Sequence, residues 1–247
     1  WEDDFAKARN FNLDQIPEEY DYILWLDEDD VLQYGANLQA IANNALEGNI
    51  DLVFCKYLYS VELDEKGKLK EILVEHMRER LFRNKSGARW VGTIHETIIL
   101  DNAKNVAIPE LVVVHLTDSE RMTANLERNI RILETQVKKE NRQDPRTVFY
   151  LGKAYFDKRH EDLKYVDEAM ICFMEYLSPD KHSSSMSGWN EERCSCWEYL
   201  SECFRIKQEN DKSLECLLKA LGEADQFPST YLSLSAHFAQ AMDWPRA

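Results

Sequence analysis

The sequence predicts two parts of different fold class: an α/β part over residues 1–117 and an all-α repeat part over residues 144–247, with a linker helix over residues 118–143 between them. In the first part, strand-like apolar runs alternate with helix-like segments, which indicates an open, mostly parallel sheet. In the last part, a pattern of large and small residues recurs every 34 residues, which is typical of stacked helical hairpins.

Four elements are expected before residue 60. Residues 4–16 form a helix, which Pro17 and the acids after it end. Residues 20–26 then form a strand, residues 35–48 a helix, and residues 50–59 a strand rich in β-branched and aromatic side chains.

The rest of the α/β part contains fewer helical signals. Residues 64–67 read as a turn, and Gly87 and Gly92 predict a loop around Trp90. Two apolar runs follow, over residues 93–100 and over residues 106–116, and Pro109 interrupts the second run.

The character of the chain changes at residue 117. Thr117 and Glu120 have the spacing of a capping box, in which a hydroxyl and a carboxylate satisfy the first N–H groups of a helix. Apolar residues then recur at helical spacing, which predicts an amphipathic helix up to the Asp144–Pro145 break. These residues are Met122, Leu126, Ile130, Leu133 and Val137.

The C-terminal part repeats itself. One set of four residues recurs 34 positions later, and an earlier copy carries an insertion at residues 182–188. The sets are Trp197, Leu200, Ser201 and Phe204; Tyr231, Leu234, Ser235 and Phe238; and, in the earlier copy, Val148, Leu151, Gly152 and Tyr155. This pattern resembles the tetratricopeptide repeat, in which neighbouring helix pairs bury a shared apolar face. An ordinary helical bundle is the alternative.

Composition restricts the class of protein. The net charge of -15, from 30 basic and 45 acidic residues, argues against a nucleic-acid-binding protein, which needs a basic face. The chain contains no apolar run of about 18 residues, so we predict no membrane span. The six cysteines are interpreted mostly as buried helical thiols of a cytoplasmic protein. A zinc site that uses Cys194, Cys196 and His182 is the weaker alternative.

Four consecutive acids, Asp27 to Asp30, end the strand-like run Tyr22–Leu26. Crowded carboxylates at the end of a buried strand repel one another, and a hard divalent cation such as Mg²⁺ or Mn²⁺ relieves that repulsion. In open α/β sheets, ligands bind just outside the carboxyl ends of the strands, which is where these acids lie. The alternative is a solvated acidic turn that caps the next helix. We expect Asp30 to be a helix cap, or to hydrogen-bond to the metal ligands without binding the metal itself.

Basic and titratable residues suggest further parts of a site. A group of cations in an otherwise acidic protein favours an anion such as a diphosphate, although solvated arginines are the alternative. The group consists of Arg78, Arg80, Arg83, Lys85 and Arg89. Glu96 could act as a general base or form a salt bridge, and His115 ends an apolar strand, where histidines bind metals or simply hydrogen-bond.

The motifs together resemble the family 2 glycosyltransferases, in the subgroup that carries C-terminal tetratricopeptide repeats. The resemblance rests on four segments and on a downstream histidine after a strand, His115. The segments are Trp1-x-Asp3-Asp4-Phe5-x-x-Ala8-Arg9-Asn10, Tyr22 to Asp30, Arg80-x-Phe82-Arg83, and Trp90-x-Gly92-x-x-His95-Glu96. Together with the repeats, this pattern spans nearly the whole chain. It implies a GT-A fold and an inverting, metal-dependent transfer of a sugar from a nucleotide-sugar donor, with a UDP-sugar as the expected donor.

The resemblance also implies residue roles. Asp27, Asp29 and His115 would bind Mn²⁺ or Mg²⁺, and Glu96 would be the catalytic base, although many relatives have Glu-Asp where this chain has His-Glu. Arg9, Asn10, Asp27 and Arg83 would contact the donor. Trp90 and His95 would contact the acceptor, which could be a peptide or protein held by the repeats.

One departure from the family concerns the start of the chain. The family begins with a strand and a loop that bind the nucleotide base, and nothing here matches them. We therefore expect nucleotide recognition to be incomplete and this chain alone to be inactive. The alternative function is a repeat-protein adaptor whose transferase part is vestigial, because stacked repeats form concave surfaces that bind peptides.

Overall fold

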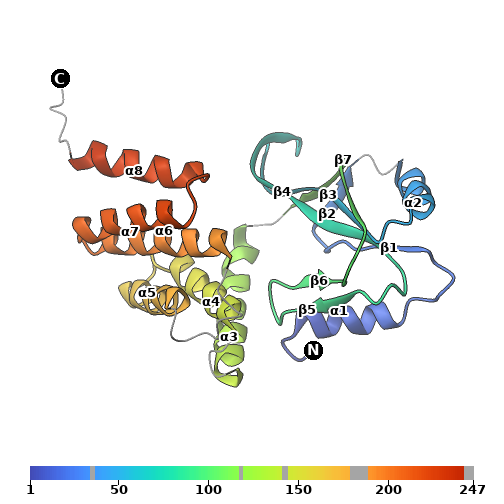
Figure 1. Cartoon of the computed structure of the whole chain (residues 1–247), viewed down its shortest axis with the longest axis horizontal. Helices are drawn as coiled ribbons and strands as arrows, with labels where there is room; N and C mark the ends of the chain where they lie inside the picture. Colours follow the sequence, from blue (N-terminus) through green and yellow to red (C-terminus); the bar gives the residue numbers. More distant parts are fainter. Residues whose placement is uncertain (34–36, 117–118, 141–143, 179–188, 242–247) are drawn as a thin grey trace. The chain divides into compact units, whose positions relative to one another are not determined.

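The computed structural model describes residues 1–33, 37–116, 119–140, 144–178 and 189–241 (Figure 1). The chain forms two compact units, over residues 1–124 and 125–247. The first is a mixed α/β unit and the second is helical, as predicted. Within the described ranges, no helix has the length and hydrophobicity needed to cross a membrane.

A five-stranded sheet of order β1-β4-β3-β7-β2 forms the centre of the α/β unit. Its strands are β1 (Tyr22–Leu24), β2 (Asp30–Gln33), β3 (Leu52–Leu63), β4 (Leu69–Arg83) and β7 (Asn105–His115). Among the described strand pairs of this sheet, only β3 and β7 run parallel. The predicted mostly parallel sheet is therefore wrong. A tight turn at residues 64–68 joins β3 directly to β4, and such a connection makes the pair antiparallel.

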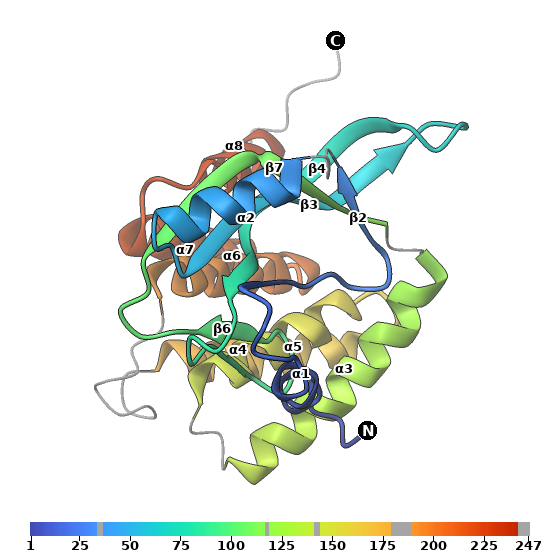
Figure 2. The same cartoon turned by 90° about the vertical axis from the view of Figure 1, so that its right-hand side faces the viewer.

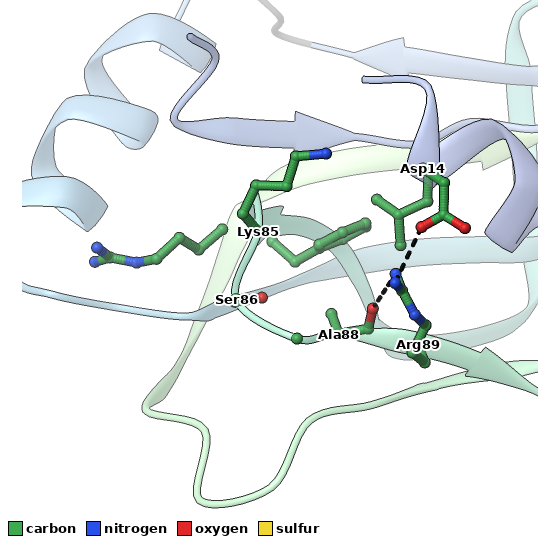
Figure 3. Close-up of a pocket in the computed structure, with 9 residues that line it drawn as sticks. Asp14, Lys85, Ser86, Ala88 and Arg89 are labelled. Atoms are coloured by element: carbon green, nitrogen blue, oxygen red, sulfur yellow. Dashed lines mark hydrogen bonds and ion pairs between the residues drawn. The ribbon is translucent and has the colours of Figure 1, made fainter. Parts of the chain in front are cut away.

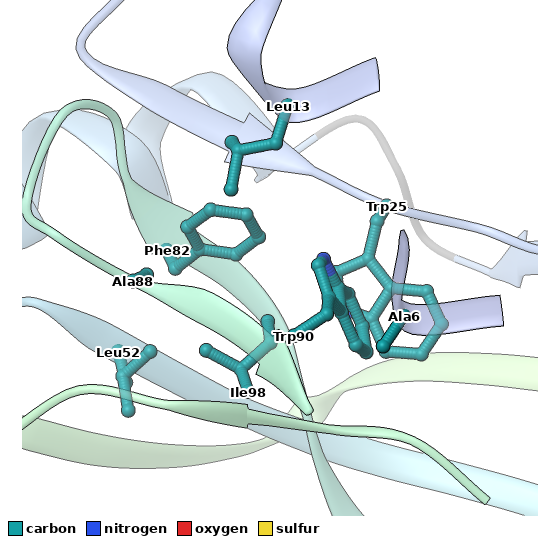
Figure 4. Packing of buried hydrophobic residues seen from close by; sticks show 8 residues of the cluster. All are labelled: Ala6, Leu13, Trp25, Leu52, Phe82, Ala88, Trp90 and Ile98. Carbon is teal, nitrogen blue, oxygen red and sulfur yellow. The ribbon is translucent and has the colours of Figure 1, made fainter. Parts of the chain in front are cut away.

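Two layers cover the sheet. On one face, α1 (Phe5–Asp14) and the small sheet of β5 (Arg89–Val91) and β6 (Thr97–Ile99) bury a cluster around two tryptophans (Figure 4). The cluster contains Ala6, Leu13, Trp25, Leu52, Phe82, Ala88, Trp90 and Ile98. On the other, α2 (Leu38–Glu47) packs its apolar side chains against β3 and β7.

Three local predictions change in the structure. Residues 69–83, interpreted above only as a source of cations, form the longest strand, β4. Trp90 lies in the short strand β5 and not in a loop, although Gly87 and Gly92 on either side do adopt positive φ. Pro109 does not end β7, because the register with β3 jumps from Ile108 to Val112 and accommodates the proline in a bulge.

The helical unit consists of antiparallel neighbours. After α3 (Ser119–Lys139), helix α4 (Pro145–Asp157) packs with α5 (Leu163–Leu177), and α6 (Asn190–Ile206) packs with α7 (Asn210–Glu223) and is followed by α8 (Pro228–Ala241). All six cysteines are buried free thiols, as predicted; five of them lie in helices, and Cys55 lies in β3. The suggested ligand His182, the residue Thr117 and the side chains of Glu120 and Met122 lie outside the described residues.

The predicted linker helix is part of the helical unit. Leu133 and Val137 of its apolar stripe are buried, and Tyr155 of α4 donates a hydrogen bond to Glu134 over 2.7 Å. The unit boundary falls at residues 124 and 125, within α3, and not at either end of the linker helix.

Replacing Gly152 with alanine is expected to lower the free energy of unfolding of the helical unit by about 1–3 kcal/mol, because the added methyl group overpacks a close helix contact. A Cβ at Gly152 would lie 2.9 Å from both Cys172 Cβ and Phe173 Cε1 of α5. Gly222→Ala is the matched control: nothing lies within 4 Å of its Cβ. Urea denaturation should show this control stabilised by about 0.5–1 kcal/mol. Equal effects of the two substitutions would contradict the packing argument.

Candidate functional site

The four acids form a tight turn between β1 and β2. The Asp30 amide donates to the Asp27 carbonyl over 3.1 Å, and the Asp27 amide donates to Asp30 Oδ2 over 2.9 Å. Asp30 begins β2, so its expected role as a helix cap is wrong. Its side chain is completely buried, whereas Asp27 and Asp29 remain partly exposed.

Pairing of β2 with β7 places Asp30 directly opposite His115. His115 Nδ1 lies 3.1 Å from Asp30 Oδ1 and 3.4 Å from Asp29 Oδ1. One potential ligand atom from each of the three residues falls within 4.8 Å of the others. Two carboxylates and an imidazole form a donor set that suits Mn²⁺ and accepts Mg²⁺. The predicted ligands Asp29 and His115 thus come together, with Asp30 as their third member.

The hydrogen bond between Asp30 and His115 shifts the pKa of each group toward its charged form. The hydrogen bond to Asp30 raises the pKa of His115 above its usual value, and burial opposes that shift only in part. Burial by itself would raise the pKa of Asp30, but hydrogen bonds from His115 and the Asp27 amide, together with the charge of Arg80, lower it. Both shifts favour an ionised Asp30 that is hydrogen-bonded to the His115 ring.

Arg80 is the buried cation of the site. Its side chain is 0% exposed, and Nη1 lies 2.9 Å from Asp30 Oδ2. The guanidinium carbon is 3.8 Å from the ring centroid of Trp25 and 4.2 Å from that of Tyr57, so two aromatic faces enclose it. Its nitrogens make no well-aligned hydrogen bond to a described residue. The contact with Asp30 is therefore mainly electrostatic.

Arg9 bridges Glu96, the candidate base, and Asp27 of the acidic turn. Its Nε donates to Glu96 Oε1 over 2.6 Å, and its Nη2 donates to Asp27 Oδ1 over 2.6 Å. Burial tends to lower the pKa of Arg9, but the bonds to Asp27 and Glu96 raise it overall. Asp27 thus pairs with an arginine and lies outside the three-residue metal cluster. Glu96 makes the salt bridge that was the alternative to a free base.

Two of three other predicted contact residues, Asn10 and Trp90, have structural roles in the unit. Asn10 exchanges two hydrogen bonds with the backbone of Trp90 and so fastens α1 to β5, which is a structural role. Trp90 is only 4% exposed and packs edge-on against Trp25, which argues against its role as an acceptor platform. His95 is exposed, directly before Glu96, with a positive φ of 54°.

The predicted basic group does not converge on one anion. Arg80 pairs with Asp30 of the acidic turn, whereas Arg78 donates to the Glu96 carbonyl over 3.1 Å. Arg83, a predicted donor contact, has its Nε 3.5 Å from Asp51 Oδ1. It lines a pocket of about 190 Å³ at the opposite end of β1. Figure 3 shows this pocket with Lys85 and Arg89 labelled. Lys85 and Arg89 line the same pocket, and Arg89 pairs with Asp14.

Sequence reasoning missed the roles of Arg80 and Tyr57. Tyr57 donates a hydrogen bond to Asp30 Oδ1 over 3.1 Å and packs on Arg80. A signal for Arg80 was present in the Arg80-x-Phe82-Arg83 motif, but nothing in that motif indicates a buried partner. No protein-family model matches this chain, and no curated protein matches it.

Proposed function

We propose that this chain belongs to a metal-dependent, inverting glycosyltransferase of the family 2 type, with a GT-A-like unit and tetratricopeptide-like helix pairs. The supporting observation is one continuous network of charges. It runs from Glu96 through Arg9 to Asp27, then through Arg80 to Asp30, His115 and Asp29. These residues lie far apart in the sequence, yet they are the ones that the family motifs supply.

The residues suit a direct displacement. Asp29, Asp30 and His115 would hold a divalent cation, which supplies charge stabilisation for the departing diphosphate when bound. Glu96 takes the proton of the acceptor hydroxyl while the acceptor oxygen attacks the anomeric carbon. The new glycosidic bond forms as the bond to the diphosphate breaks, with inversion at that carbon. Arg9 orients Glu96 and balances its charge.

Calorimetric titration of the protein with Mn²⁺, followed by a UDP-sugar, tests this function. We expect Mn²⁺ to bind and Asp29→Ala to weaken its affinity at least about tenfold, because one of three ligands is lost. Glu28→Ala is the matched control, since this exposed acid of the same turn lies outside the three-residue cluster. Binding of Mn²⁺ that is equally strong in both variants would rule out the proposed site.

A second candidate is a repeat-protein adaptor with a vestigial transferase unit. It is favoured by the salt bridge between Arg9 and Glu96, since one oxygen of the Glu96 carboxylate is already engaged by the guanidinium. In this reading the helix pairs bind a peptide, and the charge network only stabilises the fold.

A further inference from the structure

A group of aromatic rings borders the metal cluster on the β3–β4 hairpin. The ring of Tyr59 stacks on His115 with a centroid distance of 5.7 Å and an interplanar angle of 6°. His76 lies 5.9 Å from Tyr59 and 5.4 Å from Tyr57. Tyr57 and Tyr59 therefore both contact the imidazole that is the proposed metal ligand, and His76 extends the group from the two tyrosines.

A β-bulge sets the position of Tyr59. In the register of β3 with β4, Leu58 pairs with Glu75 and Ser60 pairs with Val74, so Tyr59 is the extra residue without an opposite partner. Bulges commonly re-aim a side chain next to a functional site. Here the bulge accompanies a ring that lies flat on His115 while it remains 50% exposed, in contrast to the buried Tyr57.

Tyr59 and His76 are open to solvent because the hairpin runs beyond the rest of the sheet. Among the described residues, β7 pairs with β3 only up to Leu58, and β1 pairs with β4 only from Leu81. Figure 2 shows the outer part of β3 and β4 extending past the other strands. His76 and Tyr59 are both exposed. One face of the Tyr59 ring covers His115, which leaves the other face for a ligand.

We propose that Tyr59 and His76 form a stacking subsite for a sugar ring, next to the metal ligands. This inference rests on the proposed transferase function and deepens it. One face of a pyranose consists mainly of C–H groups, so a flat aromatic ring buries that face while the hydroxyl groups stay hydrated. A sugar on Tyr59 would lie beside Asp29 and His115, where the attached phosphate would meet the cation.

Calorimetry on the full chain with Mn²⁺ tests the subsite. The probes are UDP-glucose, UDP-galactose, UDP-N-acetylglucosamine and UDP itself. We expect Tyr59→Ala to weaken binding of at least one UDP-sugar by about tenfold, because the ring area that covers the sugar is lost. The affinities for Mn²⁺ and for UDP should not change, and Tyr59→Phe should keep the affinity of the unchanged protein. Tyr20→Ala, which removes a 54% exposed tyrosine before β1, is the matched control.

The outcomes separate this inference from the proposed function. If Mn²⁺ binds but Tyr59→Ala leaves the affinity for every UDP-sugar unchanged, the subsite is overturned and the transferase proposal stands. An equal loss for UDP and for the UDP-sugars overturns the sugar assignment, because the ring would then hold the base. If the unchanged protein binds no Mn²⁺, the proposed function fails, and the subsite that rests on it fails too. A methyl glycoside can also be titrated without Mn²⁺. If it binds to the unchanged protein and to Tyr59→Phe but not to Tyr59→Ala, the subsite is supported, and its ligand is the acceptor sugar.

Discussion

Replacing Arg80 with methionine is expected to lower the free energy of unfolding of the α/β unit by about 3–5 kcal/mol. Arg80 and the carboxylate of Asp30 are both fully buried, with 2.9 Å between Nη1 and Oδ2. Methionine keeps much of the apolar volume between Trp25 and Tyr57 but leaves Asp30 without its nearest cation. Chemical denaturation followed by tryptophan fluorescence measures the loss, because Trp25 is in contact with the guanidinium.

Two further variants show whether the loss comes from the buried charge. Arg89→Ala removes an exposed ion pair with Asp14 and should cost less than about 1 kcal/mol. The double variant Arg80→Met, Asp30→Asn removes both charges and should recover part of the stability that the single variant loses. If Arg80→Met costs no more than Arg89→Ala, the ion pair with Asp30 does not stabilise the fold.

Local patterns in the sequence predicted the positions of several helices and strands. Pro17 and the acids after it marked the end of α1, and the apolar run before Asp27 marked β1. The run that ends at His115 is the end of β7 in the structure. Each of these patterns depends only on neighbouring residues, such as a helix breaker or a short apolar run, and is therefore visible without knowledge of the fold.

Strand β4 shows why other parts could not be predicted. Its outer half, Leu69–Met77, alternates poorly between polar and apolar residues because both of its faces are exposed, so the period-2 signal of a half-buried strand is missing. At its inner half, Val53 pairs with Leu81 and Phe54 pairs with Glu79, so Arg80 is the extra residue of a bulge. A bulge depends on the partner strand, and a single segment does not encode it.

Some residues of the candidate site could likewise be predicted from the sequence, and others could not. The family motifs indicated Asp27, Asp29 and His115 as metal ligands. The sequence could not indicate that Asp30 would be the buried acid, because its burial follows from the register of β2 with β7, two strands that lie about 80 residues apart. The neutralisation of Asp27 by Arg9 likewise requires α1 to pack beside the acidic turn, which is a tertiary contact.

Replacing Glu96 with glutamine distinguishes the two candidate functions. If Glu96 takes the acceptor proton, this substitution should lower kcat by about 10²–10⁴-fold, because an amide cannot act as a base. The fold should persist, since the amide oxygen of glutamine can still accept the hydrogen bond from Arg9 Nε. Because this chain alone is expected to be inactive, a nucleotide-sugar transfer assay on a protein in which the family's nucleotide-binding strand and loop precede Trp1 measures kcat. Thermal unfolding of the same preparation reports the stability.

The matched control for this substitution is Glu79→Gln. Glu79 is buried to a similar degree in the same unit, but its carboxylate accepts hydrogen bonds from Thr97 and from the Ile98 amide and not from an arginine. A structural role alone would give Glu96→Gln and Glu79→Gln comparable losses of stability and leave kcat unchanged in both, which would exclude Glu96 as the base. No transfer by the unchanged protein either would favour the adaptor. A selective loss of kcat in Glu96→Gln requires the carboxylate itself to take part in the reaction, which means that its pairing with Arg9 orients the base without disabling it.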